Sequence, residues 1–81
     1  MTKNFKTVIE KTEFEFHTMN VKQLRLFQVY VTDGNERKRF HMQVNEKGIF
    51  HIAKPDACPE RLRHLEQALH FAILENGEEK L

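Results

Sequence analysis

Hydrophobic and polar residues alternate along the first two thirds of the chain with the period of two that is typical of half-buried β-strands. The alternation predicts four strands, over residues 7–18, 23–32, 38–45 and 49–54. Asparagine, aspartate and glycine, which tolerate the backbone angles of tight turns, separate these ranges. The pattern therefore predicts a run of antiparallel strands joined by short hairpins.

The last hairpin can be placed in register from the sequence alone. A three-residue loop that ends at Gly48 pairs Val44 with Phe50 and Met42 with Ile52, and all these apolar side chains then share one face. A shift of one residue would turn Phe50 and Ile52 to the opposite face. Glycine also supplies the left-handed conformation that closes such a loop. The sequence therefore predicts the three-residue loop.

A helical pattern follows, from Cys58-Pro59 to Asn76-Gly77. Proline suits the first position of a helix, and Gly77 is predicted to end it in the left-handed conformation. One stripe about 100° wide carries the apolar residues expected to face the core. These residues are Leu62, Leu65, Leu69, Ala72 and Ile73, whereas Phe71 and Leu74 fall outside the stripe.

These elements predict an α+β fold, a four-stranded antiparallel meander with one C-terminal helix packed on one face. We expect a single domain over 1–81, with an ordered core over about 5–76 and short flexible ends. The helix should cover the face that carries Phe14, Phe16, Phe27, Val29, Val31, Phe40, Met42, Val44, Phe50 and Ile52. The other face, called the open face below, should meet solvent.

The open face is predicted to carry more apolar surface than solvent normally meets. The residues concerned are Leu24, Leu26, Tyr30 and Ile49. They could form an interface with a partner, be covered by residues 1–10, or simply stay exposed. Phe71 and Leu74 form a second candidate patch, for which the alternatives are a contact with Leu81 or plain exposure.

Charge and composition narrow the classes of partner. The 81 residues carry a net charge of +1, so no strong field draws the molecule to nucleic acid or to an anionic membrane. No apolar run is long enough for a signal peptide or a membrane span. The single cysteine allows no internal disulfide and fits a reducing compartment, so we expect a cytoplasmic protein.

Basic residues are concentrated in the middle of the chain. Arg37, Lys38 and Arg39, with Lys22 and Arg25, could follow the phosphate backbone of a single-stranded nucleic acid. The alternative is that they keep a hairpin soluble and guard a sheet edge. The order of four strands and a helix is similar to that of a family of dimeric single-strand DNA-binding domains, a similarity of element order without matched residues.

The sequence does not predict that candidate residues for catalysis or metal binding lie close together. His17 and His51 are predicted on opposite edges of the meander, about 14 Å apart, which is too far for one zinc ion. Cys58 lies at a helix N-terminus, which lowers a thiol pKa, but no histidine is placed beside it. No glycine-rich phosphate loop is present. We therefore expect no enzyme, metal, cofactor or small-molecule ligand.

The sequence thus predicts a small non-enzymatic interaction module that forms a homodimer or binds a small protein partner through the open face. The alternative is single-strand nucleic-acid binding by the basic hairpin.

Overall fold

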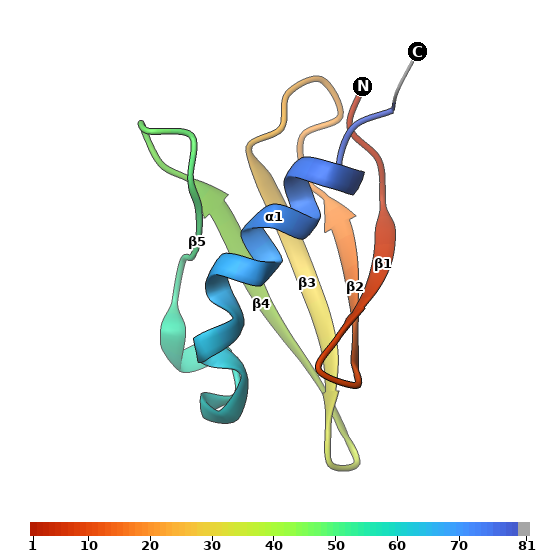
Figure 1. Cartoon of the computed structure of the whole chain (residues 1–81), viewed down its shortest axis with the longest axis vertical. Helices are drawn as coiled ribbons and strands as arrows, with labels where there is room; N and C mark the ends of the chain where they lie inside the picture. Colours follow the sequence, from red (N-terminus) through yellow and green to blue (C-terminus); the bar gives the residue numbers. More distant parts are fainter. Residues whose placement is uncertain (80–81) are drawn as a thin grey trace.

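The computed structural model describes residues 1–79, so the predicted contact through Leu81 lies outside the described residues. Five antiparallel strands follow one another in chain order across a single sheet, and one C-terminal helix crosses one face of it (Figure 1). The strands are β1 (Phe5–Ile9), β2 (Thr12–Thr18), β3 (Leu26–Asp33), β4 (Glu36–Val44) and β5 (Phe50–Ile52). The α+β meander is confirmed, but the predicted count of four strands is wrong.

The additional strand arises because residues 7–18 form a hairpin and not one strand. Glu10 and Lys11 make the turn, with φ angles of 50° and 64°, and Ile9 pairs with Thr12 across it. Such turns match the twist of a hairpin, and they usually contain glycine or asparagine. As a result β1 extends the sheet beside β2. The alternative that residues 1–10 cover the open face is therefore wrong.

The predicted register of the last hairpin is confirmed. Val44 pairs with Phe50 and Met42 with Ile52, and Gly48 has a φ of 80°. The side-chain carboxamide oxygen of Asn45 accepts hydrogen bonds from the backbone N–H groups of Lys47 and Ile49, which fixes the loop. The apolar pattern and the glycine together determine this part of the sheet.

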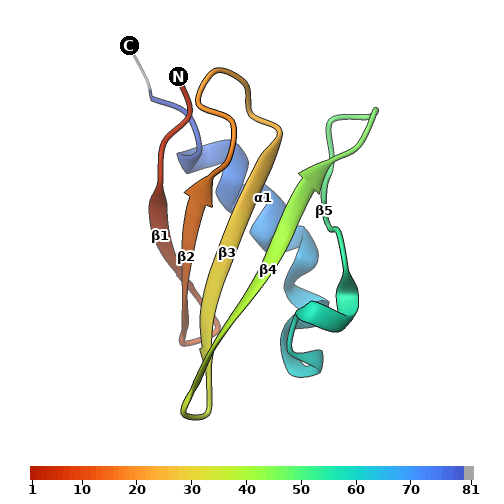
Figure 2. The same ribbon diagram turned by 180° about the vertical axis from the view of Figure 1, so that it is seen from behind.

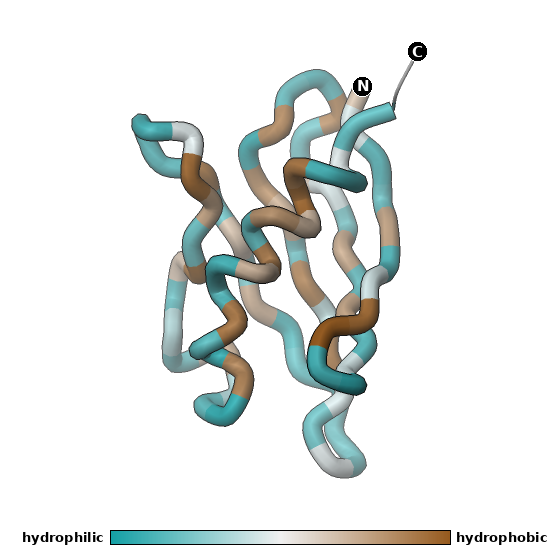
Figure 3. Tube along the Cα trace, in the orientation of Figure 1, coloured by the Kyte–Doolittle hydropathy of each residue, from teal (hydrophilic) through white to brown (hydrophobic). Residues whose placement is uncertain are grey.

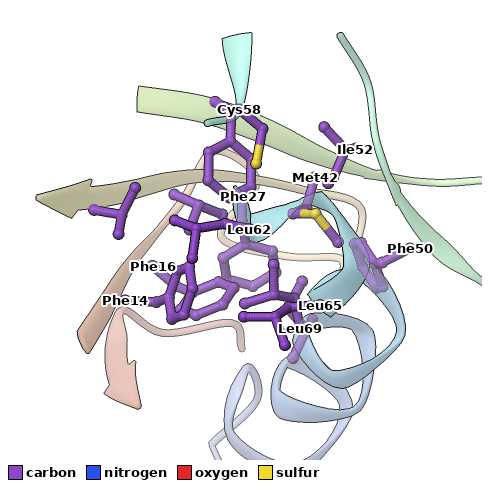
Figure 4. Packing of buried hydrophobic residues seen from close by; sticks show 14 residues of the cluster. Phe14, Phe16, Phe27, Met42, Phe50, Ile52, Cys58, Leu62, Leu65 and Leu69 are labelled. Carbon is purple, nitrogen blue, oxygen red and sulfur yellow. The ribbon is translucent and has the colours of Figure 1, made fainter. Parts of the chain in front are cut away.

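The core lies between the sheet and the helix, and hydrophobic and hydrophilic residues alternate along the strands around it (Figure 3). Phenylalanine rings and leucine side chains from the two layers interlock there (Figure 4). The rings of Phe5 and Phe16 stack with centroids 4.3 Å apart. All ten sheet residues predicted to face the helix belong to the core, nine of them buried and Val44 partly buried.

The helical region is less regular than predicted. Two 3₁₀ segments, η1 (Pro55–Ala57) and η2 (Glu60–Leu65), precede the α-helix α1 (Glu66–Asn76). The five residues of the predicted apolar stripe are all buried. Gly77 ends the helix but keeps a right-handed conformation, with φ −77°, so its predicted left-handed conformation is wrong.

Close packing explains the glycine at position 77. A Cβ atom there would lie 2.7 Å from the carbonyl oxygen of Ile73 and 2.8 Å from Cδ1 of Leu24. Real Cβ atoms essentially never come so close to other atoms. The residue therefore allows the helix end to approach the segment before β3.

Candidate interaction surfaces

Of the four apolar residues predicted on the open face, the structure places two there. Leu26 and Tyr30 lie on β3 and are partly exposed on the open face. Leu24 precedes β3 and packs against the core beside Gly77, so its predicted place on the open face is wrong. Ile49 lies just before β5, where it lines a depression together with helix residues. The open face is thus less apolar than predicted.

The largest exposed apolar side chains of the predicted set lie on the helix side. Phe71 is 50% exposed, Leu74 49% and Ile49 47%. A depression of about 320 Å³ lies between α1 and the β5 edge, and its lining includes Ile49, Phe50 and Phe71. A second depression, of about 350 Å³, lies between α1 and β1, and Phe71 lines it as well. Phe71 therefore stands on the outer side of the helix, between two hollows.

The β5 edge of the sheet is closed by side chains of the helix. Nδ1 of His70 accepts a hydrogen bond of 3.0 Å from the backbone N–H of Phe50. A carboxylate oxygen of Glu66 accepts one of 2.9 Å from the N–H of Ile52. Both N–H groups point away from β4, since backbone bonds join Asn45 to Ile49 and Ala53 to His41, and hydrogen-bonded pairs alternate along the ladder between them. A further strand could not add here without displacing the helix.

The opposite edge, β1, is open. No strand lies beyond β1 among residues 1–79. Val8, the fourth of its five residues, is 64% exposed. Among residues 1–79, the only backbone pairing on this side is at the chain ends, where residues 1–3 meet residues 77–79. Sequence reasoning missed this edge because it merged β1 with β2, and no glycine or asparagine marked the turn between them.

Seen from behind, the open face carries no helix (Figure 2). Tyr30 is the centre of a polar cluster there. The guanidinium of Arg37 lies 4.5 Å from the centre of its ring, and the ring of His17 meets it edge-on. Glu15 accepts hydrogen bonds from His17 at 2.8 Å and from Arg37 at 3.1 Å. These bonds, that of His17 first, lower the pKa of the Glu15 carboxyl.

The basic residues proposed for nucleic-acid contact are dispersed. Arg37 and Arg39 point to the open face, whereas Lys38 alternates to the other side and pairs with Glu36 at 2.8 Å. This pair raises the pKa of Lys38. Lys22 and Arg25 precede β3, whereas Arg37 follows the turn at its far end, about 20 Å away at 3.3 Å per residue. The structure brings together only two of the five.

Cys58 does not have the environment of a reactive thiol. It is 1% exposed within the core, and burial, more than any neighbouring charge, raises its pKa to about 11. The lowered pKa expected at a helix N-terminus is therefore wrong, because the residue precedes a 3₁₀ segment and points into apolar surroundings. Among residues 1–79, no three side chains of histidine, cysteine, aspartate or glutamate gather as metal ligands would.

No family model, curated protein or solved structure matches this chain significantly. Within residues 1–79, no helix has the length and hydropathy needed to cross a membrane.

Proposed function

We propose that this protein is a small interaction module without catalytic chemistry, which self-associates through the α1 side of the molecule. The observation that carries the proposal is the half-exposed ring of Phe71 between two hollows that apolar side chains partly line. The cytoplasm remains the proposed compartment, since the only cysteine is a buried free thiol.

Burial of the exposed half of a phenylalanine ring, about 100 Å², contributes about 2 kcal/mol. A symmetric dimer counts this contribution twice, together with that of the surrounding apolar side chains. Association costs about 4 kcal/mol or more in lost translational and rotational freedom. Phe71 alone would therefore support only weak association, and its neighbours must contribute the rest.

The polar character of the open face favours the helix side over the surface predicted first. Tyr30 there already has Arg37 over its ring and His17 at its edge, so part of its apolar area is covered within the molecule. Leu24 packs against the core. Of the aliphatic residues predicted for the open face, only Leu26 is partly exposed there, because Ile49 lines the depression beside α1.

Sedimentation velocity over a wide range of concentration tests the proposal, with Phe71→Ser and Leu26→Ser as matched variants. We expect the wild type to dimerise, Phe71→Ser to weaken the dimer about tenfold or more, and Leu26→Ser to leave it unchanged. Loss of the dimer only in Leu26→Ser would return the interface to the open face. A wild type that stays monomeric up to millimolar concentration would overturn self-association altogether.

A second candidate function rests on the open-face cluster. Tyr30, with Arg37 over its ring and Arg39 directly opposite in register, offers one stacking surface flanked by cations. Titration with a single-stranded oligonucleotide at low and high salt tests this candidate. It predicts affinity that falls steeply with salt and that Tyr30→Ala reduces. No binding at low salt would exclude it.

A further inference from the structure

We infer that a second copy of this chain pairs antiparallel with β1, so that the two sheets become one continuous sheet across a two-fold axis. This inference rests on the proposed self-association and specifies its geometry. Three properties of the β1 edge carry it: free backbone groups, a self-complementary sequence and a neighbouring groove.

The two edges of the sheet differ in what they offer. At β5 the outward N–H groups of Phe50 and Ile52 are already bonded to α1 side chains. At β1 no further strand of the described chain lies on the outer side, and none of the backbone bonds between elements involves a residue of β1. Because each copy has one open and one closed edge, pairing at β1 ends at a dimer and does not grow into a fibre.

The turn determines which β1 groups point outward. The two-residue turn closes on Ile9 and Thr12 as a hydrogen-bonded pair, and such pairs alternate along an antiparallel ladder. Phe5 and Thr7 therefore also bond towards β2, whereas the N–H and C=O groups of Lys6 and Val8 point outward. In agreement, Thr18 carries the next N–H group after that of Phe16 that points from β2 towards β1, and it bonds to the side chain of Asn4.

The sequence of β1, Phe-Lys-Thr-Val-Ile, complements itself when read in the opposite direction. Pairing centred on Thr7 sets Phe5 opposite the partner's Ile9, so that two partly buried apolar residues meet on the core face. It also sets Lys6 opposite the partner's Val8, as the pair that exchanges backbone hydrogen bonds in both directions. No like charges face each other within the strand, and every outward group finds a partner.

The depression between α1 and β1, called the groove here, would add contacts of the helix layer to the backbone pairing. Its lining includes Thr7 and Ile9 of β1 and the apolar α1 residues Ala68, Phe71 and Ala72, with Glu75 and Asn76 at the end of the helix. A two-fold axis perpendicular to the sheet keeps both helices on the same face, one on each side of the paired β1 strands. The two grooves then meet, and Phe71 of each copy stands beside the junction. This arrangement explains why an aromatic residue remains exposed on the outer side of α1.

The experiment compares the dimer dissociation constants of variants of the full chain by sedimentation. Val8→Lys places a lysine opposite the partner's Lys6, and Val8→Glu places a carboxylate there. Position 8 is mostly exposed, so both variants should fold. Because cross-strand charge pairs act in both halves of the dimer, we expect about tenfold weaker association for Val8→Lys and tighter association for Val8→Glu.

Val8→Pro provides a second test. It removes an N–H that only a partner strand uses, and proline is tolerated on edge strands. We expect Val8→Pro to abolish the dimer while circular dichroism shows a folded monomer. The matched control, Thr7→Pro, removes an N–H that bonds to β2 and should destabilise the fold itself.

Dimerisation of all the Val8 variants at the wild-type constant would overturn strand pairing. If Phe71→Ser still weakens that dimer, the proposed self-association through α1 stands without it. A wild type that is monomeric at every concentration overturns both the strand pairing and the proposed function.

Discussion

The imidazole of His70 accepts a hydrogen bond of 3.0 Å from the backbone N–H of Phe50, twenty residues earlier in the chain. One helix turn before it, Glu66 accepts a similar bond from Ile52. The same helix therefore covers the core with Leu69 and Ile73 and closes the β5 edge with its polar side chains. The asymmetry between the two sheet edges follows from the position of α1.

Replacement of His70 by alanine tests the closure of the β5 edge. The N–H of Phe50 would lose its acceptor at a largely buried site, which costs about 1–3 kcal/mol of unfolding free energy. Urea denaturation of His70→Ala measures this loss. His64→Ala is the matched control, since the His64 side chain is 60% exposed and its contact with Glu10 should contribute little. Equal stability of the two variants would contradict the bond to Phe50.

We expect that substitutions in the turn between β1 and β2 can raise the stability of the protein. Glu10 and Lys11 hold positive φ angles that L-residues other than asparagine and glycine adopt at a cost. The double variant Glu10→Asn and Lys11→Gly should raise the unfolding free energy by about 1 kcal/mol. Thermal denaturation measures it. Lys11→Val, β-branched at a left-handed position, should lower stability, and a gain in this variant would contradict the turn geometry.

This turn also shows where sequence reasoning fails. The register of β4 and β5 could be predicted because an apolar pattern and a glycine agreed on it. The β1–β2 turn could not, because Glu10 and Lys11 are ordinary residues whose conformation follows from the pairing of the strands on either side. For the same reason the open edge could not be predicted, since it exists only because β1 and β2 are separate strands.

A glycine that serves close packing and a glycine that serves a turn should respond differently to substitution. Gly77→Ala and Gly77→Asn should both lower the unfolding free energy by about 1–3 kcal/mol, because any Cβ meets Ile73 and Leu24. At Gly34, with φ 64° and open space around it, asparagine should be tolerated better than alanine. Denaturation curves of the four variants test this. Equal tolerance of asparagine at both sites would contradict the packing at Gly77.

The thiol of Cys58 should be inert in the folded protein. With its pKa raised to about 11, its alkylation by iodoacetamide at pH 8 should be about a hundredfold slower than that of free cysteine, and urea should restore the rate. Fast alkylation of the native protein would contradict the burial.

The same raised pKa predicts a pH dependence of stability. Between about pH 9 and pH 11 the unfolded chain releases the thiol proton while the folded protein retains it. Unfolding therefore becomes easier as pH rises through this window. The difference in unfolding free energy between wild type and Cys58→Ala should shrink from pH 8 to pH 10.5. A constant difference would contradict the raised pKa.

The placement of individual side chains was harder to predict than the two faces of the sheet. Alternation assigned the core residues of β2 to β5 correctly, but it missed Phe5 and Ile9 of β1, which also pack against the core. It failed at Leu24 and Ile49, which lie just outside β3 and β5, where the strict alternation of a strand no longer applies. Their surroundings depend on how the helix end and the hairpin loop pack, and these contacts are distant in sequence.

Residue-resolved amide hydrogen exchange at low and high protein concentration tests the central claim most directly. Strand pairing predicts that the N–H groups of Lys6 and Val8 exchange freely in dilute solution and become protected as concentration rises. Those of Phe50 and Ile52 should be protected at every concentration, because α1 already bonds them. Free exchange of Lys6 and Val8 in a solution shown by sedimentation to contain dimers would contradict the claim.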